Sequence, residues 1–479
     1  MMTLKLWNTM ANALEEFQPM ESGEARMYNC GPTVYSDPHI GNFRSFLMAD
    51  LLRRTLDQRG YRTVQIMNIT DVGHLTTDDV ADATGEDKLE KKAREEGLDP
   101  FEIARTYEDI FHENAQQLHL RKAHEYPRAT DHIPEMITMI EQLIERGHAY
   151  DVPGVGVYFR VHSFDQYGCL SGNTLENLDS GSRIAVDDRK ESPHDFALWK
   201  IDEKHLMQWD SPWGRGFPGW HIECSAMSHK YLGGTFDIHT GGEDNIFPHH
   251  ECEIAQSVGS GVGEFAKVWV HARHLLVDGE KMSKSKGNFF TINDLFEKGY
   301  QGYEIRYSLI NSHYRQPMNF TLQGLEGDSK AVQRIRSLRE KLEESSSSAG
   351  GGSENLPALM EKARQDFDAC IDDDLNVSGA LGVLHETVRA LGREEPTGQA
   401  ATAALEFLRH CDEILGVIFV EESSAAEELS EEHQGWIQQR EQARKDKDWA
   451  LADQLRDQLL EVGIQIEDGP EGTTWSRVR

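Results

Sequence analysis

The feature that most constrains this fold is a strand, a helix and a second strand that follow one another between residues 25 and 70. ARMYNC (25–30) has the apolar character of a short strand, and GNFRSFLMADLLRRTLDQRG (41–60) has the periodicity of a helix closed by Gly60. TVQIMNIT (63–70) is again strand-like. This order predicts a βαβ unit with a right-handed crossover in an α/β, doubly wound parallel sheet. Ligands of such sheets bind beyond the carboxyl ends of the strands, where Cys30, His39 and Thr70 are expected.

The predicted order of strands and helices changes along the 479 residues and divides the chain into regions. Strand and helix alternate again from about residue 219, after a region that has the character of an inserted connective segment. Beyond residue 300 the pattern is helical, without a competing strand signal until GIQIEDGPEGTTWSRV (463–478), which has strand-like alternation and a turn. SSSSAGGGS (345–353) has the composition of a flexible linker or loop. We expect an α/β domain at 1–300 with a connective insertion at about 110–215, a helical bundle at 301–425 and a small C-terminal domain at 426–479.

Charge limits the partners of the chain. Acidic residues outnumber basic ones by 82 to 49, and the net charge of −33 opposes indiscriminate binding to phosphate backbones. A nucleic acid would need a local basic face. One candidate runs from 329 to 341, and an ordinary solvated helix face is an equal interpretation. Its basic residues are Lys330, Arg334, Arg336, Arg339 and Lys341.

No apolar run of about 18 residues is present to span a membrane, and the first residues lack the pattern of a secretory signal. We therefore expect a cytoplasmic protein with no membrane partner. The six cysteines are scattered, which in a reducing compartment favours free thiols or metal ligands over disulfides.

Four residues have the chemistry of one zinc site. Zinc prefers four ligands drawn from Cys, His and carboxylate, and His249 and Glu253 stand one helical turn apart. Cys30 at a strand end and Cys224 on a helix would complete the set. His250 and Cys252 are alternative ligands, although a helix would turn both away from the Glu253 side.

Two short motifs suggest a nucleotide. In PHIGN (38–42) His39 stands where a strand gives way to a helix, so its ring and the free helix N–H groups could face phosphate oxygens, and Gly41 lets the nucleotide approach the backbone. KMSKS (281–285) carries lysines and hydroxyls suited to a pyrophosphate leaving group. An exposed basic loop is the alternative interpretation of KMSKS.

The order and length of these motifs identify a resemblance. The chain is similar to the class I aminoacyl-tRNA synthetases, and within that class to the cysteinyl-tRNA synthetase family over nearly its whole length. The matching stretches are MYNCGPTVY, PHIGN, NITDVGHL, PGWHIECSAM, FDIHTGGEDNIFPHH, EIAQS, KMSKSKGNF, RYSLINSHYRQPMNF, KDWALADQLRD and GTTW.

The resemblance implies a Rossmann-type catalytic domain, a stem-contacting (DALR-type) helical bundle and a C-terminal anticodon-binding domain. It implies a ligase that activates L-cysteine with Mg·ATP, transfers it to the 3′-terminal adenosine of tRNA(Cys) and holds one Zn²⁺ per chain; we expect a monomer. The implied roles are zinc ligation by Cys30, Cys224, His249 and Glu253, a cysteine pocket of Thr70, Trp220 and His239, ATP contacts by His39, Gly41, Asn42, Asp244, Lys281 and Lys284, and anticodon contacts by Arg444, Trp449, Asp453 and Asp468.

The sequence departs from the family at three points. PHIGN ends in Asn42 where many class I synthetases have histidine, NITDVGHL replaces a more acidic run, and Cys252 stands where many relatives carry asparagine. Two other functions remain open. A cysteine:amino-sugar ligase of the mycothiol type would make the same adenylate but lacks the terminal KDWALAD and GTTW segments, and a catalytically silent tRNA-binding paralogue would be free to lose the zinc ligands.

Overall fold

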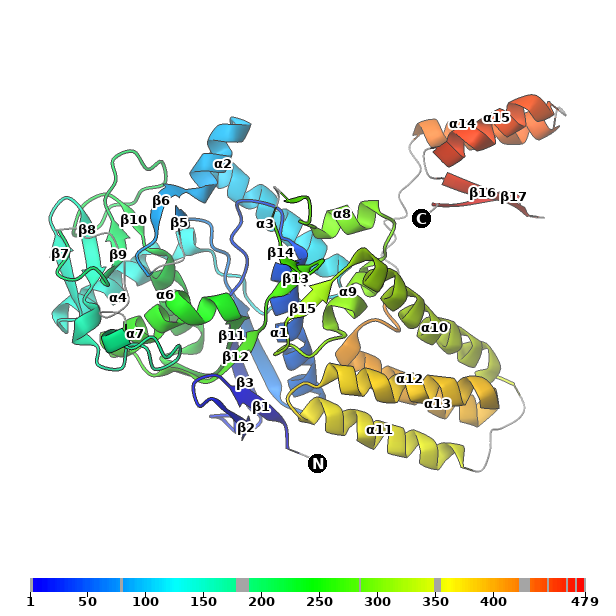
Figure 1. The fold of residues 1–479 in the computed structure, drawn as a ribbon, viewed down its shortest axis with the longest axis horizontal. Helices are drawn as coiled ribbons and strands as arrows, with labels where there is room; N and C mark the ends of the chain where they lie inside the picture. The colour runs from blue at the N-terminus through cyan, green and yellow to red at the C-terminus, as the bar shows by residue number, and fades with distance from the viewer. Residues whose placement is uncertain are drawn as a thin grey trace.

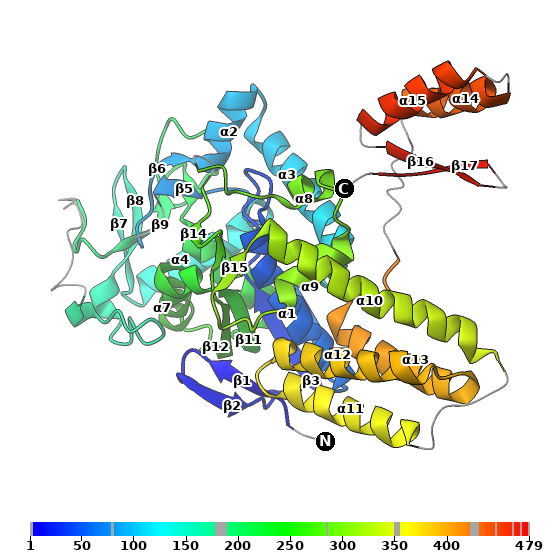
Figure 2. The same cartoon turned by 45° about the vertical axis from the view of Figure 1, so that its right-hand side comes forward.

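The computed structural model describes residues 3–77, 81–177, 189–283, 286–348, 355–421, 431–445, 448–461, 464–469 and 472–477. Figures 1 and 2 show an α/β body, a helical bundle beside it and a small C-terminal unit. Within these described ranges no helix has the length and apolar character needed to cross a bilayer.

A four-stranded parallel sheet lies at the centre of the α/β body, in the order β12-β11-β3-β4. Successive side chains of a strand point to opposite faces, so one face packs Met27 against helix α1 and the other packs Tyr28 against α6. The predicted βαβ unit is confirmed. Its strands are β3 (Glu24–Asn29) and β4 (Arg62–Met67), joined by α1 (Ile40–Gln58), and the sheet is completed by β11 (Thr235–Gly242) and β12 (Phe265–Ala272).

Helix α1 begins where the sequence provides a reciprocal cap. The Asn42 backbone N–H donates to His39 Nδ1 (3.2 Å), and the Asn42 side-chain oxygen accepts from the His39 backbone N–H (3.0 Å). The helix therefore starts directly beyond the carboxyl end of β3, with its free N–H groups at the edge where ligands bind.

Between β4 and β11 the chain leaves the sheet and forms a separate layer (Figure 1). An antiparallel sheet in the order β10-β9-β8-β7 packs with α4 and α6 around a second core. The elements are β5 (Leu75–Thr77), β6 (Thr84–Asp87), α2 (Lys88–Glu96), α3 (Pro100–Gln117), α4 (Ile133–Glu145), β7 (Ala149–Val152), β8 (Gly156–Phe159), β9 (Phe196–Lys200), β10 (Phe217–Pro218) and α6 (Trp220–Leu232), with short turns η1 (Ala129–His132) and η2 (Val161–Ser163).

After β11 the chain makes an irregular turn before the next helix. The elements there are η3 (Glu243–Asn245), the π-turn η4 (Ile246–His250) and α7 (Glu251–Ser260). At the other end of the body the hairpin of β1 (Lys5–Asn8) and β2 (Ala13–Glu16) lies against β12.

The expectation that no strand occurs between residue 300 and the terminal segment is wrong at one place. β15 (Met318–Phe320) pairs in parallel with β13 (Leu275–Val277), which also pairs with β14 (Glu280–Lys281). A three-residue strand is too short to show a period, and its partner lies some 40 residues earlier, so only tertiary contact defines it. The nearby helices are α8 (Ile292–Glu297) and α9 (Gly302–Ile310).

The helical bundle contains α10 (Leu322–Ser346), α11 (Leu356–Asp372), α12 (Val377–Glu394) and α13 (Gly398–Leu415). Helix α10 continues into the serines of the predicted linker, and residues 349–354 lie outside the described residues. The C-terminal unit pairs α14 (Glu431–Lys445) and α15 (Trp449–Glu461) with the hairpin of β16 (Ile464–Gly469) and β17 (Gly472–Arg477), as the terminal alternation predicted.

Candidate functional site

A cleft of about 800 Å³ opens at the carboxyl ends of β3, β4 and β11. His239 and Glu253 lie buried beneath its surface and do not line it. Lys284 lies outside the described residues. The other residues predicted for cysteine, ATP or metal line this cleft: Cys30, His39, Gly41, Asn42, Thr70, Trp220, Cys224, Asp244, His249 and Lys281.

Two thiols, an imidazole and a carboxylate meet at the floor of the cleft. One ligand atom from each of Cys30, Cys224, His249 and Glu253 lies within 4.8 Å of the other three. Cys30 directly follows β3, Cys224 is on α6, and the last two residues stand one turn apart on either side of the start of α7. The sequence separated these groups by up to 223 positions, and the sheet brings them together.

The cluster fits a divalent cation. The Glu253 carboxylate is fully buried, and its Oε1 has no hydrogen-bond partner among the described residues, although it lies 3.1 Å from His249 Nε2. Burial raises the pKa of the Cys224 thiol well above its usual value. A cation bound there would favour the thiolate and give this carboxylate oxygen a partner, and two thiols, an imidazole and a carboxylate are ligands that zinc prefers.

His239 supports the cluster from below. Its Nε2 lies 2.7 Å from Glu253 Oε2, and its Nδ1 lies 3.1 Å from the Tyr28 carbonyl oxygen. A ring whose two nitrogens are both engaged in this way orients the carboxylate. The structure therefore places His239 behind Glu253, a predicted metal ligand, and not on the cleft surface where cysteine was expected to bind.

His250 differs from the expectation that a helix turns it away. Its Nε2 lies 3.2 Å from Cys30 Sγ, and it forms a second possible metal group with Cys30 and His239. The cause is local: residue Phe247 has non-helical dihedrals, so the chain through 246–250 does not follow the helix geometry expected from the sequence. Cys252 does point elsewhere, toward the Tyr167 hydroxyl at 3.5 Å.

Trp220 covers the cluster on the cleft side. Its ring stacks on the His249 ring at 4.4 Å between centroids and 27° between planes. A second histidine, His74, stacks on the same indole at 4.5 Å and 14°. His74 was not among the predicted site residues. One indication of its role was present in the sequence: it belongs to NITDVGHL, a motif that begins directly after β4.

The two nucleotide motifs pack on each other. A β-carbon at Gly41 would lie 2.8 Å from Met282 Cε and 3.0 Å from the His39 ring, so the absence of a side chain permits this approach. The His39 ring also contacts Phe289 edge-on at 5.3 Å, and the Ile40 N–H donates to the Phe290 carbonyl at 3.0 Å. Met282 and the Phe289–Phe290 segment therefore lie over the start of α1, with Lys281 exposed at the cleft; the last two residues of KMSKS lie outside the described residues.

The four residues predicted for the anticodon lie far from the cleft, in the C-terminal unit. Arg444 is near the end of α14, and Trp449 begins α15 with 59% of its surface exposed. Asp453 stands one turn further along the same helix, 3.3 Å from Arg456. Asp468 is on β16 opposite Thr473, and its side chain lies outside the described residues.

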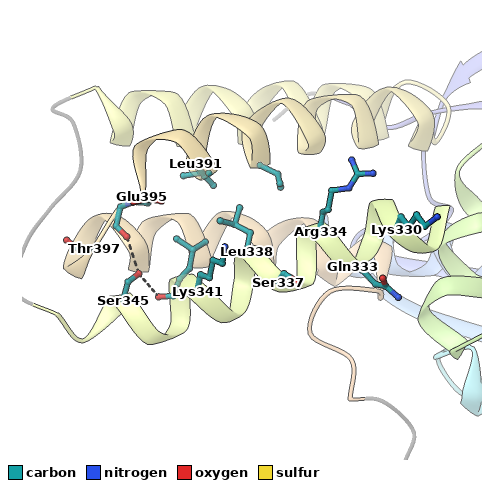
Figure 3. Close-up of a pocket in the computed structure, with 14 residues that line it drawn as sticks. Lys330, Gln333, Arg334, Ser337, Leu338, Lys341, Ser345, Leu391, Glu395 and Thr397 are labelled. Carbon is teal, nitrogen blue, oxygen red and sulfur yellow. Dashed lines mark hydrogen bonds between the residues drawn. The ribbon is translucent and has the colours of Figure 1, made fainter. Parts of the chain in front are cut away.

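The basic face predicted at 329–341 separates into two groups. Arg336 and Arg339 turn inward and donate to carbonyl oxygens of Val417 and Ile418 after α13. The remaining cations line a groove of about 830 Å³ between α10 and α12, where Figure 3 shows the Arg334 and Lys330 side chains along one helix. The cations of the groove are Lys330, Arg334 and Lys341.

Arg334 and Lys341 are exposed, and within the part of the chain that the structure describes neither makes an ion pair or side-chain hydrogen bond; Lys330 bonds Glu326. Leu338, Leu342 and Leu391 form the apolar floor. The groove therefore presents two cations without an ion-pair partner among the described residues, and its lining also contains Glu395.

Comparison with known proteins agrees with this geometry. The sequence model of the family described as tRNA synthetases class I (C) catalytic domain matches residues 16–330, and models of a DALR domain and of a cysteinyl-tRNA ligase anticodon binding domain match 366–420 and 426–475. A methionyl-tRNA synthetase of Mycobacterium tuberculosis, in complex with methionyl-adenylate, shares the fold with a TM-score of 0.57 at 13% identity, over 82% of this chain and 90% of its own. The fold and the cleft are thus those of a class I aminoacyl-tRNA synthetase.

Relatives with similar sequences identify the family within this class. The cysteine–tRNA ligase of Salinibacter ruber is 41% identical over 99% of this chain and 98% of its own length, and that of Caldicellulosiruptor saccharolyticus is 42% identical over 99% and 100%. The cysteine–tRNA ligase of Thermus thermophilus is 42% identical over 99% of each chain. This chain belongs to the cysteinyl-tRNA synthetase family.

Proposed function

We propose that the cleft activates L-cysteine with Mg·ATP and passes it to tRNA(Cys). In the first step a carboxylate oxygen of cysteine attacks the α-phosphorus, and pyrophosphate leaves as the new P–O bond forms. In the second step the 2′-hydroxyl of the terminal adenosine attacks the activated carbonyl, and AMP leaves. The observation that carries this proposal is the cluster of Cys30, Cys224, His249 and Glu253 at the floor of the same cleft whose rim holds both nucleotide motifs.

The cluster would determine which amino acid the cleft accepts, through the side chain of the substrate. We infer that these four residues would hold one Zn²⁺, which when bound would supply a Lewis acid for the substrate thiol. Trp220 covers one side of the site and restricts the space beside His249. Serine presents a hydroxyl that is not ionised at neutral pH, and a site that requires a specific polar bond rejects analogues lacking it by roughly 10⁴-fold, so no separate editing site is required.

The start of α1 is the proposed binding site for the phosphate groups of ATP. Because His39 Nδ1 accepts the Asn42 N–H, the neutral ring carries its proton on Nε2, which is then a donor for a phosphate oxygen. The N–H groups of the first helical turn add to this positive end, and the absent side chain at Gly41 keeps the approach open. Lys281 from β14 and Lys284 complete the charge for pyrophosphate, and Asp244 lies across the cleft for the adenylate.

The tRNA is proposed to run from the cleft along the bundle to the C-terminal unit. The groove of Lys330, Arg334 and Lys341 offers positive charge to stem phosphates. Trp449 exposes its ring for stacking, and Arg444, Asp453 and Asp468 offer charge and hydrogen bonds to anticodon bases. The terminal unit, matched over 426–475 by a model of an anticodon-binding domain, favours tRNA over an amino sugar as the acceptor.

The test is charging of tRNA(Cys) with labelled cysteine, with adenylate formation followed in parallel by cysteine-dependent ATP–pyrophosphate exchange. We expect both activities in the purified protein and loss of both when a chelator strips the metal. Exchange without charging would instead indicate the amino-sugar ligase. For a silent paralogue, neither activity would appear, and Cys224→Ser would leave tRNA affinity and all other behaviour unchanged.

A further inference from the structure

His74 forms one wall of the cleft although it belongs to none of the groups described above as ligands or phosphate contacts. It precedes β5, is 7% exposed and lines the cleft. Its ring and the His249 ring each stack on Trp220, at 4.5 Å and 4.4 Å between centroids. The indole that covers the metal cluster is thus held between two histidines.

Both nitrogens of His74 are engaged. Nε2 lies 3.2 Å from Lys88 Nζ, and Nδ1 lies 3.0 Å from Thr33 Oγ1. An ammonium group has only donors, so Nε2 accepts from Lys88 and the proton of the neutral ring is on Nδ1, where it donates to Thr33. The Lys88 cation in turn lies 5.3 Å over the Tyr35 ring. These contacts fix the plane of the His74 ring, and so the plane on which Trp220 stacks.

The backbone before His74 is pressed against the start of α6. Gly73 has φ +75°, and a β-carbon there would lie 2.8 Å from the Pro218 carbonyl oxygen. Trp220 follows that proline by two residues. The segment carrying His74 and the segment carrying Trp220 are therefore held together by main-chain packing as well as by the ring stack.

We propose that His74 is a positioning residue that sets the size limit of the amino-acid pocket: by fixing Trp220 across His249, it confines the metal-bound thiol to a side chain with a single methylene. This inference rests on the proposed cysteine activation. A fixed indole closes the space that a longer thiol, such as homocysteine, would need, whereas a mobile indole would admit it. One extra methylene in a closed pocket costs roughly 10- to 200-fold in kcat/KM.

The experiment distinguishes the effect of the His74 ring from the effect of its two hydrogen bonds. His74→Phe keeps an aromatic ring and removes both hydrogen bonds, His74→Gln keeps polar atoms and removes the ring, and His74→Ala removes both. His229→Ala, at an exposed position on the same helix as Trp220, is the matched control. Each protein is assayed by ATP–pyrophosphate exchange with cysteine and with homocysteine, and its bound zinc and thermal unfolding midpoint are measured.

We expect His74→Ala and His74→Gln to raise KM for cysteine about tenfold and to lower the cysteine-to-homocysteine ratio of kcat/KM by a similar factor. The KM for ATP and the zinc content should stay unchanged. His74→Phe keeps a ring for Trp220 to stack on but loses the hydrogen bonds that fix its plane, so its selectivity ratio should lie between those of the wild type and His74→Ala. The inference is overturned if the selectivity ratio of the Ala and Gln variants stays within twofold of the wild type, or if KM for ATP rises in step with KM for cysteine. A wild-type protein without cysteine-dependent exchange would overturn the proposed function itself, and this inference with it.

Discussion

Gly41 and Met282 lie against each other across the cleft rim, so close that a methyl group on residue 41 would lie 2.8 Å from Met282 Cε and could be accommodated only if Met282 moved. This packing joins the start of α1 to the segment that carries the second nucleotide motif. Any movement of that segment must therefore pass over the helix terminus that we propose binds the phosphates.

Substitution of Gly41 by Ala should impair ATP use without unfolding the protein. The new methyl group displaces Met282 or the His39 ring, so we expect kcat/KM for ATP in pyrophosphate exchange to fall by about 10- to 100-fold, since misplacement of about 1 Å near reacting groups has costs of that order. Gly382→Ala is the control, because that glycine is exposed on α12 with nothing near its β-position. The control should keep full activity and gain roughly 0.5–1 kcal/mol of stability. Normal ATP kinetics in Gly41→Ala would contradict the close packing.

His239→Gln should weaken metal binding while leaving all four proposed ligands in place. The ring orients the Glu253 carboxylate across a distance of 2.7 Å, and removal of such a partner typically costs 10- to 100-fold in metal affinity. Competition with a chromophoric chelator measures this directly. His132→Gln, at a buried histidine remote from the cluster, serves as the comparison and should retain wild-type affinity.

Removal of the exposed positive charges of the groove should weaken tRNA binding and leave the other activities unchanged. Arg334→Gln and Lys341→Gln each remove one exposed cation, so we expect a weaker tRNA affinity and a salt-dependence slope that is smaller by about one for each cation that pairs with a phosphate. Cysteine-dependent pyrophosphate exchange should not change. Lys362→Gln, on α11 and paired with Asp366, is the matched control and should not alter tRNA binding. Unchanged tRNA affinity in both groove variants would remove the bundle groove from the tRNA path.

Arg306 joins the α/β body to the bundle and should be essential to stability. It is fully buried, pairs with Asp50 at 2.6 Å and donates to the Leu415 carbonyl at 2.6 Å. Burial tends to raise the pKa of the Asp50 carboxyl, but the cations Arg306 and Arg54 outweigh it and the pKa is lowered. Arg306→Met leaves that carboxylate with fewer partners, and we expect the free energy of unfolding, measured with denaturant, to fall by about 3–5 kcal/mol. A decrease below 1 kcal/mol would show that the pair adds little.

Stability should depend on pH through His205. Burial lowers the pKa of this histidine, but Asp87 and Glu90 outweigh burial and raise the pKa to about 9. Because the folded-state pKa lies above the usual value of about 6.5, the stabilisation is fully present below pH 6.5 and is lost as the pH rises through 9. The difference in unfolding free energy between wild type and His205→Gln, measured from pH 6 to 10, should therefore shrink by up to about 3 kcal/mol. A difference that stays constant with pH would rule out protonation of His205 as its source.

Some parts of the fold were predictable because their signals are local. The βαβ unit, with a helix that starts near Gly41, follows from periodicity within 25–70, and the terminal hairpin follows from alternation in β16 and β17. The strand β15 was missed because three residues carry no period, and His250 was misplaced because a single non-helical residue, Phe247, changes the direction of the chain.

The sequence by itself determined which chemical groups are present and which local elements carry them. Only the tertiary structure decided which groups meet: the parallel register of β3 with β11 brings Cys30 toward the segments that hold His249 and Glu253, and α6 adds Cys224. The same holds for the stack of His74 on Trp220, and for the division of one basic helix face into an inward pair and an open groove. The reason is that spacing within a helix or strand is fixed by backbone geometry over a few residues, whereas distances between elements depend on sheet register and on the packing of both cores.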